Sequence, residues 1–372
     1  MGSIVLESAD AARLPAGTAL AVDRDVFSAG VHDRVMAHPR IRVERGEVTT
    51  LPSPAVIATG PLTSDALAER IRERLGVESL AFYDAIAPIV AAESVDMNVA
   101  FTASRYDKET SGVETEGAYI NCPMSREQYD AFIAALREAD QFTAHEFDAV
   151  PYFEGCMPVE EIARRGAESL RFGSMKPVGL TDPRARKRPW AVVQLRAEDR
   201  AGRMRNLVGF QTRLRIPEQQ RVFRMIPGLE NAEFLRFGSI HRNAYINAPA
   251  ALTPHLSLRD DPRVLFAGQL TGVEGYTEST ASGILAAINL DRMSRGLEPV
   301  LPPPTTMLGA LYRHLREADA RHFQPMNANF GLLEALESPP RDKARRKEAY
   351  AERALRDFRS WMDANGVVAA TV

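Results

Sequence analysis

Apolar residues along this chain follow two spacings, one typical of strands and the other of helices. Short apolar runs at residues 55–58 and 264–266 indicate buried strands. Each run is followed by glycine and then by a helical pattern, so the sequence predicts two strand–glycine–helix units. Further strands are expected at 3–8, 19–24, 41–51, 190–199, 206–216 and 221–226, and further helices at 23–38, 64–75, 124–140, 159–170, 307–319 and 343–365.

The order of these elements predicts two domains. From about residue 82 to residue 247, regular alternation of strand and helix gives way to mixed helices and strands joined by polar loops. We therefore predict a discontinuous α/β domain of residues 1–81 and 248–372, which carries an inserted α+β domain of residues 82–247. A chain of 372 residues is of ordinary length for two domains.

Composition and net charge indicate where the protein is located and what it can bind. The chain is 45% hydrophobic and 26% charged, and no apolar run approaches the roughly 20 residues that span a bilayer. Because the first residues also lack the pattern of a signal peptide, we expect a cytoplasmic protein without a membrane partner. With a net charge of −3, a nucleic-acid partner would need a local basic patch. Two clusters could supply it, although most charge runs are solvated faces: Arg184, Arg186, Lys187 and Arg188, and Arg341, Lys343, Arg345, Arg346 and Lys347.

The turn after the strand at 264–266 carries a strong local signal of a binding site. Gly268, Gly272 and Gly275 fall within eight residues, ahead of a helix whose first turns are rich in small residues. Backbone amides and the helix dipole at such a turn favour a pyrophosphate or an electron-rich ring. A turn in which glycine only relieves backbone strain is the alternative that this pattern leaves open.

The two cysteines have different surroundings. Cys156 comes directly before the helix expected from about Val159, and amides at a helix N-terminus stabilise a thiolate, so it is a candidate nucleophile. A buried cysteine that packs as a small apolar residue is the alternative, and the sequence favours neither. Cys122 has no comparable neighbour and is expected to be structural. The seven histidines lack metal-ligand spacing, so no metal site is expected.

Several stretches together resemble one family, the folate- and FAD-dependent tRNA (uracil-5-)-methyltransferases. They run through most of the chain: PAGTALAVDRDVFS, VIATGPLTS, YINCPM, YFEGCMPVE, NLVGFQT, RVFRMIPGLENAEFLRFGSIHRNAYIN, LFAGQLTGVEGYTESTASG and QPMNANFGLLE. The resemblance implies a Rossmann-like FAD-binding domain with an inserted domain. It also implies that reduced FAD and methylenetetrahydrofolate supply a methyl group to C5 of the T-loop uridine of tRNA, with NAD(P)H as the reductant.

The resemblance assigns roles to individual residues. The family uses two catalytic cysteines, one of them in the GCMP turn, which implies that Cys156 is catalytic. A thiolate that adds to C6 of uracil makes C5 nucleophilic. The residues that would lie along the flavin are Gly268, Gln269, Gly272, Val273, Glu274, Gly275 and Tyr276, while Thr59 and Gly60 would lie near the dinucleotide. We assign folate contacts to His241 and Arg242 because they are polar residues in an apolar strand context; a buried histidine with satisfied hydrogen bonds is the alternative.

The chain departs from the family pattern at its beginning. The family opens with strand–GxGxxG–helix and carries its second catalytic cysteine in a CSNS-type stretch, and this sequence contains neither motif. We therefore expect that an N-terminal portion of about two βαβ units, roughly 30 residues each, is missing. From this we predict weak or no flavin binding and an activity that is reduced or lost. Cys122 belongs to a different motif and does not replace the second cysteine.

Two other functions stand as alternatives. FAD-dependent tRNA wobble-uridine modification enzymes share the AGQ…G…GY and IPGLENAE stretches, but they are much longer and lack the GCMPVE and INCPM stretches. The third possibility is a catalytically inactive tRNA-binding protein that retains the inserted domain and the basic clusters.

Overall fold

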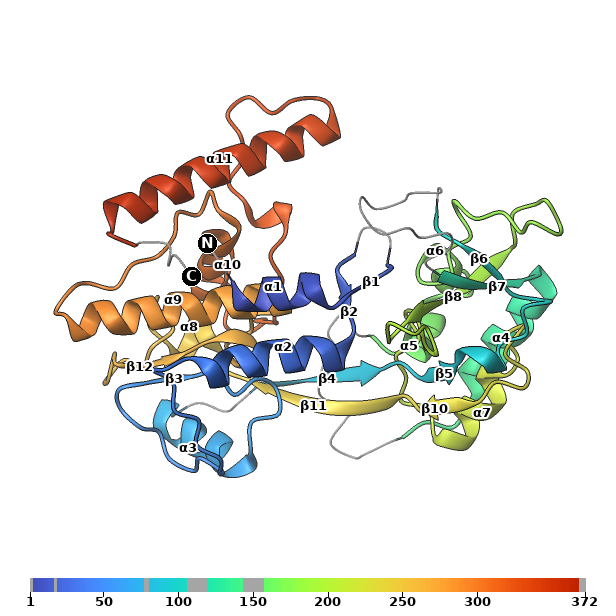
Figure 1. Ribbon diagram of the computed structural model, residues 1–372, viewed down its shortest axis with the longest axis horizontal. Coiled ribbons are helices and arrows are strands. Elements are labelled where there is room, and N and C mark those ends of the chain that lie inside the picture. Colours follow the sequence, from blue (N-terminus) through green and yellow to red (C-terminus); the bar gives the residue numbers. More distant parts are fainter. Residues whose placement is uncertain (1–2, 17–18, 77–79, 106–118, 143–156, 368–372) are drawn as a thin grey trace. The chain divides into compact units, whose positions relative to one another are not determined.

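The computed structural model describes residues 3–16, 19–76, 80–105, 119–142 and 157–367 (Figure 1). The contacts between residues divide the chain into two compact units. The first unit combines Glu44–Phe82 with Arg242–Val372, and the second combines Ser3–Val43 with Tyr83–His241. Two paired strands, β4 (Leu80–Ile86) and β11 (Ser239–Tyr245), carry the chain from one unit to the other.

The first unit is built around a parallel pair of short strands. β3 (Ala55–Ile57) and β12 (Val264–Phe266) pair in register, with Leu265 opposite Val56. Since the strands are parallel, the loops that follow them leave from the same edge. Helices and 3₁₀ turns make up the rest of this unit: α3 (Asp65–Leu75), α8 (Ala248–Ala251), η4 (Gly268–Thr271), α9 (Tyr276–Ser294), α10 (Met307–Glu317), η5 (Phe330–Leu332) and α11 (Lys343–Ala364).

The second unit is built around a six-stranded antiparallel sheet. Its strand order is β10-β5-β9-β8-β7-β6. The strands are β5 (Ile89–Ala91), β6 (Phe101–Ala103), β7 (Tyr119–Met124), β8 (Ala191–Ala197), β9 (Met204–Leu207) and β10 (Phe234–Arg236). The other elements of this unit are α1 (Ile4–Ala11), β1 (Arg13–Leu14), β2 (Ala21–Val22), α2 (Arg24–Ala37), η1 (Ala92–Ser94), α4 (Arg126–Glu138), α5 (Val159–Arg165), α6 (Ser169–Phe172) and α7 (Ile216–Phe223).

Helices with clear caps and a regular apolar face are where the sequence predicts them. In α4, Ser125 and Gln128 form a capping box, and the four predicted apolar positions are all buried: Tyr129, Phe132, Ile133 and Leu136. In α3, Ser64 caps the N-terminus and Gly76 ends the helix in the left-handed conformation, with φ of 62°. None of the described helices is long and apolar enough to cross a membrane.

Three predicted strands are wrong, and of the strand predicted at 206–216 only Asn206 and Leu207 lie in a strand, β9. Residues 3–8 lie in α1, where Ser3 caps the helix by accepting a hydrogen bond from the Leu6 amide at 3.3 Å. Residues 221–226 cover the end of α7, whose buried residues Gln219, Val222 and Phe223 follow helical spacing. Residues 41–51 form no strand, because Ile41, Val43 and Val48 are exposed and bury no face.

The division into units differs from the predicted domains for residues 3–43. These residues group with the second unit, whereas we expected them in the first. Polar contacts made by this segment explain the difference. The Tyr119 hydroxyl donates to the Ala16 carbonyl at 3.1 Å, and Arg24 pairs with Glu198 at 3.1 Å. Since contacts of this kind join distant parts of the chain, the sequence pattern did not show them.

Candidate functional site

The glycine turn, residues 268–275, joins β12 to α9 at the carboxyl edge of the parallel pair. All three predicted glycines have positive φ: 70° at Gly268, 85° at Gly272 and 98° at Gly275. Residues other than glycine rarely adopt such backbone angles. The backbone of this turn therefore depends on glycine at each of the three positions.

Gly272 is also required because a neighbouring ring approaches it closely. A Cβ atom at this position would lie 2.6 Å from Cζ of Phe323. Phe323 is buried, and its ring packs against the rings of Tyr245 and His314, with both centroid distances at 5.9 Å. The Phe323 ring thus has little room to move away.

A network of buried hydrogen bonds stabilises the start of the turn. The Gly268 amide donates to Ser282 Oγ at 3.2 Å, and Ser282 Oγ lies 3.3 Å from the Tyr312 hydroxyl. Thr271 Oγ1 donates to the Gly268 carbonyl at 2.8 Å. Ser282 and Thr271 are fully buried, and burial raises the pKa of Tyr312 to about 12, so its phenol stays neutral. These bonds hold the start of the turn against α9 and α10.

The far end of the turn is held by a second segment of the chain. The Met326 amide donates to the Gly272 carbonyl at 2.9 Å, and the Glu274 amide donates to the Met326 carbonyl at 2.9 Å. Gln269 Nε2 donates to Glu274 Oε1 at 2.7 Å, across the turn itself. The glycine turn is therefore fixed at both ends by hydrogen bonds.

The N-terminus of α9 has the properties of a binding position. Gly275 is its N-cap residue and provides no side-chain hydrogen bond, and the Tyr276 side chain is 92% exposed. The amides of residues 276–278 have no acceptor within the helix, because they belong to its first turn. Amides at the positive end of a 19-residue helix favour an anionic or electron-rich group, and the Glu278 carboxylate already lies against Gly275 at this end. Any group bound there would also lie near Glu278, whose carboxylate accepts a hydrogen bond from the Ala328 amide at 3.3 Å.

Thr59 and Gly60 lie at the same edge of the parallel pair as the glycine turn. The Ala267 amide donates to the Ile57 carbonyl at 3.0 Å, so the two strands end side by side. Gly60 has φ of 73°, and no atom lies within 4 Å of the position that a Cβ would take. Thr63 Oγ1 donates to the Gly60 carbonyl at 2.9 Å and closes this second turn. The structure thus brings together the two turns that the sequence identified separately.

The predicted nucleophile, Cys156, lies outside the described residues. The structure does describe the helix that follows it, α5, which is anchored by Glu160. The buried Glu160 carboxylate accepts hydrogen bonds from the Arg213 amide at 2.7 Å and from Thr212 Oγ1 at 2.9 Å. Burial raises the pKa of Glu160. Glu160 belongs to the GCMPVE stretch, but its anchoring role was not predicted because its partners are distant in sequence.

The other predicted site residues are placed only in part. His241 and Arg242 lie in β11, and their side chains are outside what the structure describes. Directly after β11, the Ile246 amide donates to the Leu270 carbonyl of the glycine turn at 2.8 Å. Cys122 is fully buried in β7, and burial raises the pKa of its thiol to about 12, which agrees with a structural role.

Sequence and structure comparisons identify similar proteins. The sequence model of a family described as "Glucose inhibited division protein A" matches residues 1–298. The protein of Geobacter sulfurreducens named methylenetetrahydrofolate--tRNA-(uracil-5-)-methyltransferase TrmFO is 57% identical over 363 residues, which are 97% of this chain and 82% of that protein. The protein of the same name from Heliobacterium modesticaldum is 52% identical over 370 residues, which are 99% of this chain and 83% of that protein.

A solved structure shares the fold. The structure of Aquifex aeolicus GidA in its form II crystal superposes with a TM-score of 0.59 and 15% identity. The match covers 82% of this chain and 55% of that chain. At this level of identity the similarity shows a common mixed α and β fold. The predicted α/β class is confirmed at this coarser level.

Proposed function

Since the chain belongs to the TrmFO family of methylenetetrahydrofolate--tRNA-(uracil-5-)-methyltransferases, we propose that it methylates C5 of a uridine in tRNA. Methylenetetrahydrofolate would donate the carbon. The observation that carries this proposal is the 57% identity to the Geobacter sulfurreducens protein over 97% of this chain. A match of that extent includes residues of both structural units. We further propose FAD as the cofactor, NAD(P)H as the reductant and the T-loop uridine as the target.

The glycine turn fits a flavin in its chemistry. It offers the amides at the start of α9, a turn whose course is set by three glycines with positive φ, and a second glycine turn at the same strand edge. Gly268, Gln269, Gly272, Val273, Glu274, Gly275 and Tyr276 would line the flavin, with Thr59 and Gly60 near the dinucleotide. Reduced flavin supplies the hydride that converts a methylene unit into a methyl group.

Cys156 is the proposed nucleophile toward uracil. Addition of its thiolate to C6 moves electron density to C5, which can then attack the one-carbon unit of the folate. The helix after Cys156, α5, is fixed by the hydrogen bonds of the buried Glu160 carboxylate. His241 and Arg242 are proposed to contact the folate.

Methyl transfer tests the proposal directly. The full chain is incubated with FAD, NADPH, methylenetetrahydrofolate labelled in its methylene carbon, and an unmodified tRNA transcript. We expect label in tRNA, and loss of label when the T-loop uridine is replaced by cytidine. Cys156→Ser should abolish incorporation, while Cys122→Ser serves as the matched control that retains it.

The other outcomes have distinct meanings. Modification at the wobble position would overturn the methyltransferase proposal in favour of a wobble-uridine enzyme. Binding of tRNA without any turnover would favour an inactive tRNA-binding protein. Absorbance near 450 nm during purification separately tests the prediction of weak flavin binding, since a stoichiometric yellow protein would contradict it.

A further inference from the structure

The start of α11 carries a dense group of positive charges. We call this group the α11 basic patch, and its members are Arg341, Lys343, Arg345, Arg346 and Lys347. All five residues are exposed, and within the described part of the chain none of them pairs with a carboxylate. The acid inside this run, Asp342, is used as the helix cap and accepts a hydrogen bond from the Arg345 amide at 2.9 Å. The patch therefore has uncompensated charge.

Contacts next to the basic patch attach α11 to its unit, and one patch member takes part in them, since Lys347 Nζ lies 5.5 Å from the centre of the Phe330 ring. Tyr350 packs edge-to-face on Phe330 with centroids 5.9 Å apart, and Arg353 donates to the Ala335 carbonyl at 3.0 Å. Near the end of the helix, Arg292 donates to the Asn365 carbonyl at 2.6 Å. Because these contacts hold α11 along its length, the basic patch is presented on a fixed element (Figure 1).

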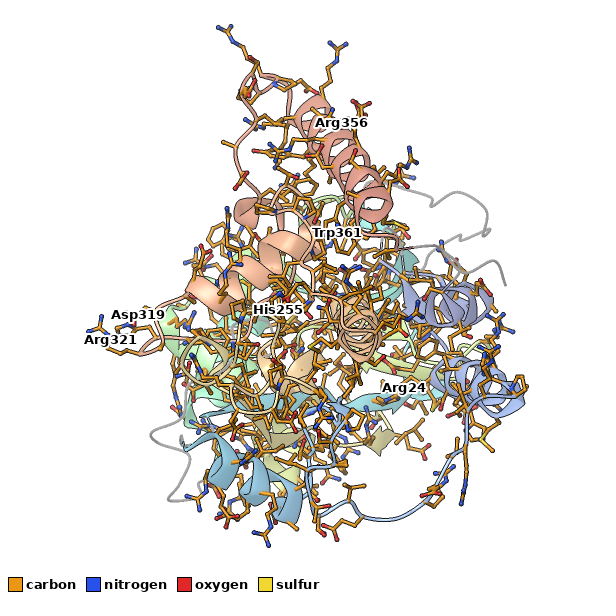
Figure 2. All side chains as sticks on the ribbon, turned by 90° about the vertical axis from the view of Figure 1, so that its left-hand side faces the viewer. Arg24, His255, Asp319, Arg321, Arg356 and Trp361 are labelled. Carbon is orange, nitrogen blue, oxygen red and sulfur yellow. The ribbon has the colours of Figure 1, made fainter. Side chains whose placement is uncertain are left out.

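The positive face continues along the helix. At 3.6 residues per turn, Arg356 and Arg359 project within about 40° of the direction of Arg345, and the three residues span about 21 Å. Arg356 and Arg359 are also exposed, and Arg356 lies on the outlying part of α11 in Figure 2. Arg356 pairs with Asp357 at 3.2 Å, and Glu352 shares this face, so the excess of positive charge is greatest in the first turns.

In the other basic cluster of the sequence, Arg184 has a structural role, whereas Arg186, Lys187 and Arg188 are exposed. Arg184 pairs with Asp182 at 3.4 Å and donates hydrogen bonds to the carbonyls of Asn98 and Val99. This arginine therefore fixes a loop to the strand region of its own unit. The α11 basic patch shows no such structural use of its arginines.

The position of α11 in the chain adds a second, independent observation. The family model of glucose inhibited division protein A ends its match at residue 298, before α10 and α11. The Heliobacterium modesticaldum relative, in contrast, aligns over 370 residues of this 372-residue chain. The segment that carries the patch is therefore shared with TrmFO proteins but lies beyond the match to the broader family.

We infer that the α11 basic patch docks the sugar–phosphate backbone of the tRNA substrate. This inference rests on the proposed function, which makes tRNA the substrate. Exposed arginines and lysines contact phosphates independently of sequence, and such contacts position a nucleic acid relative to the site that modifies it. The patch supplies this local attraction in a protein whose net charge is −3.

A charge-matched pair of triple variants tests the inference. One variant is Arg341→Gln/Arg345→Gln/Arg346→Gln, which removes three charges of the patch. The control is Arg70→Gln/Arg72→Gln/Arg74→Gln on α3, which removes three exposed arginines of the same unit that pair with Glu73, Glu69 and Asp260. Binding of the unmodified tRNA transcript is measured by fluorescence anisotropy at several KCl concentrations, and circular dichroism verifies that both variants are folded.

We expect the patch variant to bind tRNA on the order of tenfold or more weakly at 0.1 M salt, because each phosphate contact adds a counterion-release term. The slope of log affinity against log salt should fall by about 2 to 3, which is three contacts at about 0.7–0.9 each. In the methyl-transfer assay, KM for tRNA should rise while kcat at saturating tRNA stays unchanged. The α3 control should leave the affinity, the salt slope, KM and kcat close to those of the unaltered protein.

Three results would overturn the inference. They are an unchanged affinity and salt slope in the patch variant, an equal loss in the α3 control, and loss of binding to anionic phosphatidylserine vesicles without loss of tRNA affinity. Failure of the proposed function is separate. If the unaltered protein binds tRNA through the patch without methylating it, the docking surface stands and the activity does not.

Discussion

Replacement of Gly272 by alanine tests whether the glycine turn has the geometry described here. Alanine at φ of 85° pays a left-handed backbone cost of about 1–2 kcal/mol. Its Cβ would also lie 2.6 Å from Cζ of the buried Phe323, and overpacking of this kind costs about 1–3 kcal/mol. Gly272→Ala should therefore destabilise the first unit by about 2–5 kcal/mol.

Gly60→Ala is the matched control for this change. Gly60 has φ of 73°, at the same strand edge, but no atom lies within 4 Å of its missing Cβ. Only the backbone cost of about 1–2 kcal/mol should therefore apply. The difference between the two variants isolates the overlap with Phe323.

The assay is urea unfolding followed by tryptophan fluorescence. The chain has two tryptophans, Trp190 in the second unit and Trp361 on α11 in the first unit (Figure 2). In a Trp190→Phe background the signal reports the first unit, where both glycines lie. An equal loss of stability in Gly272→Ala and Gly60→Ala would refute the packing argument.

A second background makes the test sharper. Phe323→Leu shortens the side chain that a Cβ at residue 272 would meet. In that background Gly272→Ala should cost little more than the backbone term, so the two changes should be strongly coupled. Additive costs would show that the ring is not the obstacle.

Three further predictions concern titrating groups. Burial raises the pKa of the Cys122 thiol to about 12, so iodoacetamide at pH 8 should leave Cys122 unmodified in the folded protein and alkylate it in urea. Peptide mass spectrometry measures the alkylation. Alkylation of Cys122 in the folded protein would contradict the prediction. Burial raises the pKa of Glu160 above 4.5, so the folded state retains this proton longer and stability should fall as pH rises from 4.5 through the folded pKa. The urea midpoint of the Glu160→Gln variant should not show this fall between pH 4 and pH 8. If the midpoints of the two proteins change in parallel with pH, Glu160 is not the cause. Hydrogen bonds, chiefly the one from the Arg321 side chain, lower the pKa of the exposed Asp319 carboxyl to about 2 (Figure 2). The contribution of Asp319 to stability is therefore present above pH 3.8 and is lost as the pH falls through 2. NMR titration of the Asp319 carboxyl should give that midpoint, and Arg321→Gln should move it toward 3.8; an unmoved midpoint would assign the shift to other groups.

The sequence by itself determined the local elements whose signals lie within a few neighbouring residues. The helix at α4 follows from its capping box and apolar spacing, and α3 follows from Ser64 and Gly76 at its two ends. The run at 264–266 and the glycines behind it predicted both β12 and the turn into α9. Ordered motifs along the whole chain also indicated the family.

Only the tertiary structure decided how these elements meet. It showed that β3 and β12 are parallel neighbours, so that two turns far apart in sequence share one edge. It placed Phe323 against Gly272, and it placed the Arg213 amide on Glu160. The physical reason is that caps and periodicity act between neighbouring residues, whereas burial and hydrogen bonding join residues from any part of the chain. The same long-range burial made a helix of α7, where local alternation had predicted a strand.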